Sequence, residues 1–340
     1  MIKSNVSIFK TSPSSLKSDL GKVFKLSYFK DLNPQKKTLI KINGNCDKYY
    51  PGSNTSPWFL DALLFQLKKR KFKDINIIEG DLFEFSVEKM LKRTFLVKVL
   101  EHNKVGYINY EKLPRDDSGL PLILKKAQII NVPVLHTHGF AKISCATKNM
   151  WGFLPVTRRH LHKCLNEKLI EIYKKIPLCT IVDGTVGLYG DSTRTGLPRK
   201  VDLILAGWDT FTIDMVATLI MGFSEEEIPL LVEARKRKLL KNFKLFGDFN
   251  IKNLPQYDFS YKDSLERRLT YWLEGISDPN FINELTSFLL HSPIIDPIYN
   301  YLRMFYNNFK YSVNKEKIFK GEWTVYEEVV PYINFRKIHG

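Results

Sequence analysis

The alternation of short apolar runs with amphipathic helices limits most strongly what this chain can fold into. The run "KTLIKINGN" (37–45) is typical of a strand, "PWFLDALLFQLKKRK" (57–71) of a helix, and "DINIIEGD" (74–81) of a second strand. A helix between two strands allows them to pair in the same direction through a right-handed connection. The sequence therefore predicts a parallel sheet covered by helices.

The same alternation continues along most of the chain. Further strands are expected at "VGYINYE" (105–111), "AQIINVPVL" (127–135), "LCTIVDG" (178–184) and "VDLILAG" (201–207). Further helices are expected near 87–102, at 158–176, at 209–222 and after the Ser224-x-x-Glu227 capping box. The fold class is thus α/β, with a mostly parallel sheet flanked by helices.

The chain changes character near Tyr261. Beyond this residue the sequence is aromatic and helix-compatible, with several prolines, and the regular alternation fades. We expect an α/β core domain over residues 1–258 and an appended, mainly helical region over 259–340.

Composition narrows the class of protein. Hydrophobic residues make up 44% of the 340 residues and aromatics 13%, which argues for a packed globular protein. Its four cysteines form no Cys-x-x-Cys pair, so we expect a reducing compartment and no iron–sulfur cluster. The first residues lack a signal-peptide run, and the most apolar late segment is interrupted by polar residues and prolines, so a soluble cytoplasmic protein without a transmembrane segment is expected.

The formal net charge of +16 indicates an anionic partner of some kind. The densest cluster of cations, "EARKRKLLKNFK" (233–244), is interpreted first as the solvated face and cationic end of a helix. Nucleic-acid binding there is the less favoured alternative, because the cluster lacks interleaved aromatic residues and any known binding motif.

Polar residues follow the predicted strands, which is where open parallel sheets bind their ligands. These residues are Lys41, Asn43 and Asn45, Glu79 and Asp81, His136 and His138, Asp183, and Asp209. Each one alone is compatible with a structural strand end or a helix cap. Parallel strands would bring them to one edge, and together they predict a binding site.

The segment "HTHGFAKISCATKNMWGFLP" (136–155) is the most informative part of this set. His136 and His138 share one face if the strand continues, and Lys148 and Asn149 follow in a stretch where glycine allows close backbone approach to a ligand. The alternative is a pair of structural histidines and an exposed lysine.

The segment "PVTRRHLH" (155–162) places Arg158, Arg159 and His160 at the expected start of a helix, where backbone amides favour an anion. Solvated arginines are the alternative. His160 and Cys164 have helical metal-ligand spacing, but two ligands do not define a zinc site, so a bound metal is less favoured.

The glycine-rich loop "DGTVGLYGDSTRTG" (183–196) matches neither a P-loop nor a dinucleotide-binding motif. It is a weaker candidate for binding an anion, through Thr193 and Arg194.

Taken together, "LIKING", "PGSNTSPWFLDALLFQLKKRKFKDINIIEGD", "AQIINVPVLHTHGFAKISCATKNMWGFLP", "IVDGTVGLYGD" and "LAGWDTFTIDMVATLIMGF" resemble the domain-of-unknown-function 362 family over roughly residues 36–253. The most specific block is "TKNMWGFLP", which is similar to the family's Lys-Asn-x-x-Gly signature. The resemblance implies a fold and site residues, but no established reaction.

This chain departs from the family pattern at three places. The family usually has Lys-x-His where His136 precedes His138, and a Gly-Asn-Gly-Pro-like turn where this chain has "GDST". Many relatives carry a ferredoxin-like cysteine cluster that is missing here. A fainter similarity to the lactate-racemase family rests on the spacing of His138 and Lys148, which in that family serve a nickel-pincer cofactor and its substrate; no nickel is predicted, because the other elements of that family are not recognisable.

We therefore expect an enzyme that acts on a small anionic metabolite by acid–base chemistry, of isomerase or group-transfer type. The expected catalytic residues are His138, Lys148 and His136. The expected substrate-binding residues are Lys41, Asn43, Glu79, Asn149, Arg158, Arg159, His160, Asp183 and Asp209. The cofactor is left open. The alternative is a non-catalytic basic protein that binds nucleic acid or an acidic partner.

Overall fold

The structure of the protein is a computed structural model. The structure describes residues 5–26, 29, 31–82, 84–139, 141–190, 194–260 and 295–335. Within these ranges the side chains of Arg159, His160, Lys163 and several residues between 295 and 303 are not described.

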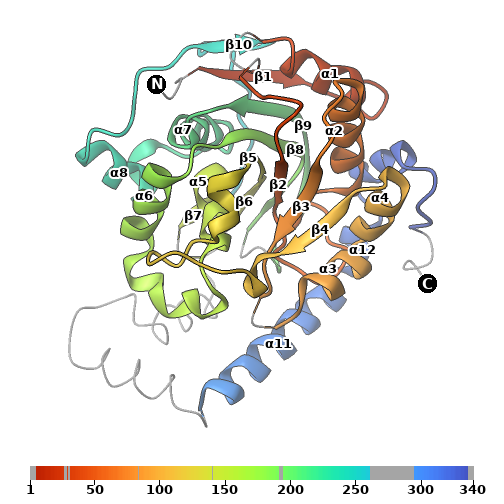
Figure 1. The fold of residues 1–340 in the computed structure, drawn as a ribbon. Coiled ribbons are helices and arrows are strands. Elements are labelled where there is room, and N and C mark those ends of the chain that lie inside the picture. The colour runs from red at the N-terminus through yellow and green to blue at the C-terminus, as the bar shows by residue number, and fades with distance from the viewer. Residues whose placement is uncertain are drawn as a thin grey trace.

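A ten-stranded mixed sheet forms the centre of the described part (Figure 1). Its strands are β1 (Val6–Lys10), β2 (Thr38–Ile42), β3 (Ile75–Glu79), β4 (Gly106–Asn109), β5 (Gln128–Val132), β6 (Val134–His138), β7 (Lys142–Ser144), β8 (Cys179–Tyr189), β9 (Leu197–Gly207) and β10 (Leu245–Gly247). The order is β10-β1-β9-β8-β5-β2-β3-β4, with β6 pairing with both β7 and β8.

The parallel part of the sheet agrees with the prediction. Strands β4, β3, β2, β5 and β8 are all joined by parallel pairing. Strand β9 pairs antiparallel to both β8 and β1, so the strands do not all run in one direction. Strands β1, β7 and β10 were not predicted; β7 and β10 have three residues each, too few for a clear hydrophobic period.

Helices cover both faces of the sheet (Figure 1). The α-helices are α1 (Leu16–Val23), α2 (Pro57–Lys69), α3 (Val87–Arg93), α4 (Leu96–Asn103), α5 (Ala146–Asn149), α6 (Leu165–Lys175), α7 (Thr210–Ile220), α8 (Pro229–Lys236), α11 (Ile295–Val313) and α12 (Lys315–Phe319). The 3-10 helices are η2 (Tyr110–Lys112), η3 (Leu122–Lys126), η4 (Met150–Phe153), η5 (Val156–Cys164), η6 (Glu225–Glu227) and η7 (Glu322–Val329).

Two hydrophobic clusters lie on opposite faces of the sheet. One contains the buried side chains of α1, α2, α3 and α4, and the other those of α6, α7 and α8. Burial of apolar area on both faces explains why the central strands are mostly apolar rather than alternating between apolar and exposed polar residues.

The described part of the C-terminal region is helical, as predicted, and packs on the core. Tyr326 stacks on Trp58 of α2 at 5.7 Å between ring centroids, and its hydroxyl donates a hydrogen bond to Asp202 of β9. Trp323 and Phe335 belong to the same buried cluster as α2. The boundary at residue 258 stays a prediction. Among the described helices, none is both long and apolar enough to span a membrane.

Two elements differ from the prediction in a way that affects the site. Strand β8 continues past Asp183 to Tyr189, so the first half of the predicted glycine-rich loop is strand. Gly184 lies at a bulge, where a Cβ atom would meet the Leu203 carbonyl oxygen at 2.6 Å. The predicted helix at 158–176 begins instead at Leu165, after the 3-10 helix η5.

Candidate functional site

A cavity of about 160 Å³ lies at the carboxyl ends of β2, β3 and β6. Seven of the residues predicted to form the site line it: Lys41, Asn43, Glu79, His138, Lys148, Asn149 and Arg158. Parallel pairing of β2 with β3 and β5 brings these segments together although they are far apart in the sequence.

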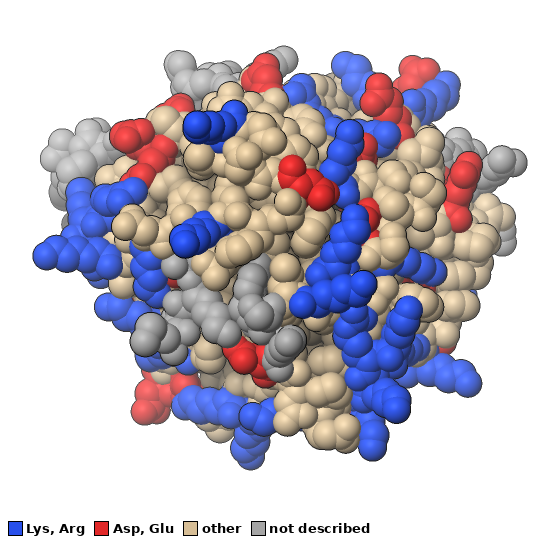
Figure 2. Space-filling view, turned by 90° about the horizontal axis from the view of Figure 1, so that it is seen from above, with Lys and Arg blue, Asp and Glu red and all other residues tan. Residues whose placement is uncertain are grey.

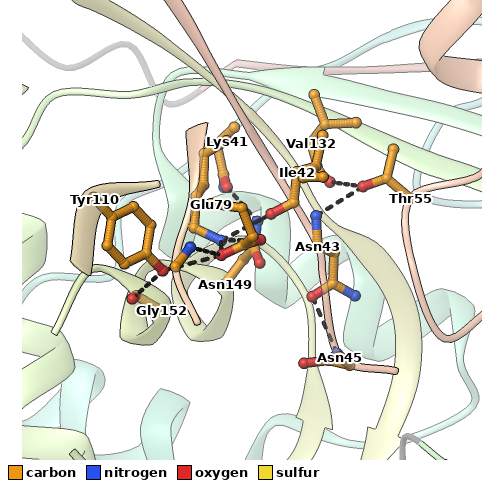
Figure 3. Close-up of polar contacts among 12 residues, drawn as sticks. Lys41, Ile42, Asn43, Asn45, Thr55, Glu79, Tyr110, Val132, Asn149 and Gly152 are labelled. Atoms are coloured by element: carbon orange, nitrogen blue, oxygen red, sulfur yellow. Dashed lines mark hydrogen bonds and ion pairs between the residues drawn. The ribbon is translucent and has the colours of Figure 1, made fainter. Parts of the chain in front are cut away.

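Lys41 and Glu79 form a buried ion pair at the floor of the cavity (Figure 3). The Lys41 ammonium lies 2.9 and 2.8 Å from the two carboxylate oxygens and also donates to the Ile42 carbonyl at 2.8 Å. The Tyr110 hydroxyl lies 3.0 Å from Glu79 Oε1 and contacts the Gly152 carbonyl oxygen. Burial lowers the pKa of Lys41, and Glu79 opposes that shift. The pair is therefore held by several hydrogen bonds, as a buried ion pair requires.

An amide cluster forms the next part of the wall. The side-chain nitrogens of Asn43 and Asn45 lie 3.2 and 3.1 Å from His136 Nε2, and Asn43 also donates to the Ser53 carbonyl at 3.0 Å. Because both amide groups are donors, His136 Nε2 accepts and carries no proton. Burial lowers the pKa of His136 to about 3. His136 is therefore neutral near pH 7 and stands behind the two amides, while His138 lines the cavity.

Helix α5, which carries Lys148 and Asn149, is fixed by an acid from α7. The Asp214 carboxylate accepts hydrogen bonds from the backbone N–H groups of Ala146 at 2.7 Å and Thr147 at 3.0 Å. Asn149 donates to the Asn131 side-chain oxygen at 2.8 Å. Burial raises the pKa of Asp214 to about 6. These contacts set the direction in which α5 presents its side chains.

Lys148 has an environment that disfavours its charged form. Burial, and then the nearby charges of Arg158 and Lys41, lower its pKa to about 7. Its ammonium lies 5.7 Å from the centre of the Trp151 ring, and within the described residues it has no hydrogen-bond or ion-pair partner. Near neutral pH, Lys148 therefore exists in both protonation states.

The cavity carries more positive than negative charge. Arg194 and Glu84 form a two-point ion pair at 2.8 and 3.1 Å, which neutralises both. Two arginines share the carboxylate of Glu111: a guanidinium nitrogen of Arg115 lies 3.0 Å from one carboxylate oxygen, and one of Arg158 lies 3.6 Å from the other.

One carboxylate cannot neutralise two guanidinium groups. Arg158 and Lys148 are therefore the incompletely balanced cations of the cavity.

Three described residues that were predicted as site residues do not line the cavity: His136, Asp183 and Asp209. Asp183 lies inside β8, where its oxygens accept from Ser56 and Thr185. Asp209 caps α7 through the Thr212 N–H, 3.3 Å away. The side chains of Arg159 and His160 lie outside the described residues.

Several lining residues were not predicted as site residues: Asn45, Glu84, Ser144, Trp151, His162 and Arg194. Asn45 was indicated only by its position after a strand, and Arg194 only by its glycine-rich loop. Asp214 and Tyr110 act through tertiary contacts with distant segments, and no local pattern marks them. The described residues contain no group of three or more His, Cys, Asp or Glu side chains arranged to hold a metal ion.

The fold and the site define a class: an α/β protein with a polar, cation-rich cavity at the carboxyl edge of a mostly parallel sheet. The chain belongs to the family described as "Domain of unknown function (DUF362)", whose model matches residues 38–218, more than half of its length. The family resemblance seen in the sequence is thereby confirmed.

A curated relative is also similar over part of its length. It is the "Thylakoid-associated protein sll1697" of Synechocystis sp., 30% identical over 112 residues, which cover 30% of this chain and 35% of the relative. The chain thus spans about a third of the relative that it matches.

Proposed function

We propose that this protein is an enzyme that acts on a small anionic metabolite by acid–base chemistry, of isomerase or group-transfer type. The observation that carries the proposal is the positive charge around Lys148 and Arg158. The other two cations that line the cavity, Lys41 and Arg194, each form an ion pair with a carboxylate. An anion placed there would complete the balance of charge.

The lining residues support a division of roles. Arg158 offers a guanidinium group, which suits a carboxylate or phosphate. Lys148, with a pKa of about 7, can gain or lose a proton at neutral pH, as acid–base chemistry requires. His138 lines the same cavity and is the second proton carrier that we propose. Asn43 and Asn149 supply amide groups to orient the substrate.

Ligand-dependent thermal stabilisation tests the proposal. Small carboxylates and phosphates are added singly, and a ligand that binds the folded state raises the melting temperature. The rise should disappear in Lys148→Ala and His138→Ala. Lys98→Ala and His102→Ala, at exposed positions on α4, serve as matched controls and should keep it. If the site variants kept the full rise, the cavity would not be the binding site.

A second candidate function has support from the surface. Figure 2 views the molecule from the side of β1, β10 and α1 and shows Lys and Arg side chains in a band across this face, with Asp and Glu side chains beside the upper part of the band. We propose as the alternative a non-catalytic basic protein of the cytoplasm that binds nucleic acid or an acidic partner. Its binding should weaken steeply with added salt and should survive His138→Ala.

Acidic membrane lipid is one such partner. The relative from Synechocystis sp. is named as thylakoid-associated. In this chain, Leu302, Phe305 and Phe309 of α11 are more than half exposed. Sedimentation with anionic vesicles tests this version of the alternative.

A further inference from the structure

The cations of the cavity differ in whether a carboxylate neutralises them. Lys41 is paired with Glu79, Arg194 with Glu84, and Arg158 shares Glu111 with Arg115. For Lys148, no acid partner occurs among the described residues. A lysine kept without a carboxylate, beside two other cations, is in the arrangement that produces a neutral, nucleophilic amine.

The helix that carries the amine is also fixed by contacts with other segments. Asp214 accepts from the first two N–H groups of α5, Asn149 is bonded to Asn131, and the Trp151 ring lies beside the Lys148 ammonium. A fixed nucleophile needs little reorganisation to attack a bound substrate. Simple charge attraction does not require this support.

We propose that Lys148 attacks the carbonyl carbon of a 2-oxo acid and forms an imine with it, while Arg158 binds the neighbouring carboxylate. The inference rests on the proposed function, since it names the substrate class of the same site. A cavity of about 160 Å³ suits a molecule of this small size.

In this proposal, Arg158 binds the carboxylate group of the substrate. Its guanidinium lies against the Leu154 carbonyl at 3.0 Å and is only partly balanced by Glu111. A planar guanidinium matches a carboxylate, and a 2-oxo acid carries that carboxylate next to its carbonyl. The positive charge also makes the carbonyl carbon easier to attack.

The Lys148 nitrogen forms a bond to the carbonyl carbon, the carbonyl π electrons move to oxygen, and the proton lost by nitrogen ends on that oxygen. His138, which lines the same cavity, then donates a proton to the hydroxyl group. The carbon–oxygen bond breaks, water leaves and the nitrogen lone pair forms the carbon–nitrogen double bond. Both electrons of the broken carbon–oxygen bond leave with the water, the product is a protonated imine, and His138 is left without the proton that it donated, so no oxidant or cofactor is needed.

Trapping with borohydride tests the inference. The full chain is incubated separately with glyoxylate, pyruvate and 2-oxoglutarate, borohydride is added, and peptides are analysed by mass spectrometry. Hydride reduces an imine to a stable secondary amine. We expect the reduced adduct on Lys148 in excess over the exposed Lys98, and no adduct at position 148 in Lys148→Arg. Circular dichroism verifies that this variant is folded.

A second pair of measurements examines the carboxylate. Arg158→Gln should reduce trapping of pyruvate about tenfold or more, the effect of losing a charge-assisted hydrogen bond. Trapping of propanal, which has no carboxylate, should fall less, because it loses only the effect of the Arg158 charge on the pKa of Lys148. An equal loss for both compounds would overturn the assigned role of Arg158.

The outcomes separate this inference from the proposed function. If a carboxylate or phosphate stabilises the protein, the effect needs Lys148, and no oxo acid gives an adduct, the imine is wrong and the anion site stands. If nothing stabilises the protein and nothing is trapped, both fail. Equal labelling of Lys98 and Lys148 would mean ordinary surface reactivity and would also overturn the inference.

Discussion

Lys41 of β2 and Glu79 of β3 form an ion pair in which both side chains are at least 95% buried. The two strands pair in parallel with Lys41 opposite Ile78, so the pair lies where both strands approach their carboxyl ends. The Tyr110 hydroxyl, from the end of the next strand, approaches the same carboxylate (Figure 3). This contact ties three neighbouring strands together at the floor of the cavity.

Removing the charge of Glu79 should therefore lower the free energy of unfolding substantially. Glu79→Gln leaves the Lys41 ammonium buried without a counter-charge, and we expect a loss of about 3–5 kcal/mol in the free energy of unfolding. Urea denaturation measures it. The double variant Lys41→Met/Glu79→Leu should lose less than Glu79→Gln, because it buries no unpaired charge. A double variant less stable than the single one would contradict this explanation.

Lys148 should make stability depend on pH in one definite window. Its pKa is about 7 in the folded protein and 10.5 in an ordinary setting. Between these values the unfolded chain binds a proton that the folded chain lacks, so the free energy of unfolding should rise with pH. Lys148→Met lacks the group and should lack this rise. Denaturation of both proteins from pH 7 to pH 10 checks the sign, and parallel curves would rule out a lowered pKa.

Asp214 should position the site without lining it. Asp214→Ala leaves two buried N–H groups without acceptors, and we expect a loss of about 2–5 kcal/mol in stability. It should also weaken ligand binding, because α5 carries Lys148. Asp61→Ala removes another buried acid, one bonded to Asn103 and Tyr332, and serves as control. It should lower stability but leave the ligand dissociation constant unchanged in calorimetry.

Asp183 should act on stability alone. Its carboxylate accepts from the backbone and hydroxyl of Ser56, the residue that precedes α2, and from Thr185. Asp183→Ala should lower the free energy of unfolding by about 1–3 kcal/mol for the unsatisfied groups and leave the ligand-induced rise in melting temperature intact. Asn149→Ala, within the cavity, should reduce that rise. Loss of the rise in Asp183→Ala would place Asp183 in the site after all.

Much of the parallel sheet could be predicted because its signals are local. Pro57 at the first turn of α2 and the apolar stripe that follows it depend only on neighbouring residues, and so does the strand of Ile75–Glu79. The direction of β9 could not be predicted in this way. Its pairing depends on which strands lie next to it in the folded protein. A run of apolar residues does not indicate whether a strand pairs parallel or antiparallel to its neighbours.

The same distinction between local signals and tertiary pairing applies to the site residues. Lys41, Glu79 and His138 were predicted because each stands at or near the end of a strand in the parallel set. Asp209 follows the antiparallel β9, and Asp183 lies within a strand that runs on through a bulge, so the same reasoning misplaced both.

By itself, the sequence determined the class of fold, the main strands and helices, the family and the excess of positive charge, since these follow from composition and from contacts between near neighbours. Only the tertiary structure decided which cations are paired, that His136 is neutral behind two amides, and that Asp214 holds the helix of Lys148. The physical reason is that the protonation state and the pairing of a titratable side chain depend on the groups around it. Those surroundings come from segments that meet only when the chain is folded.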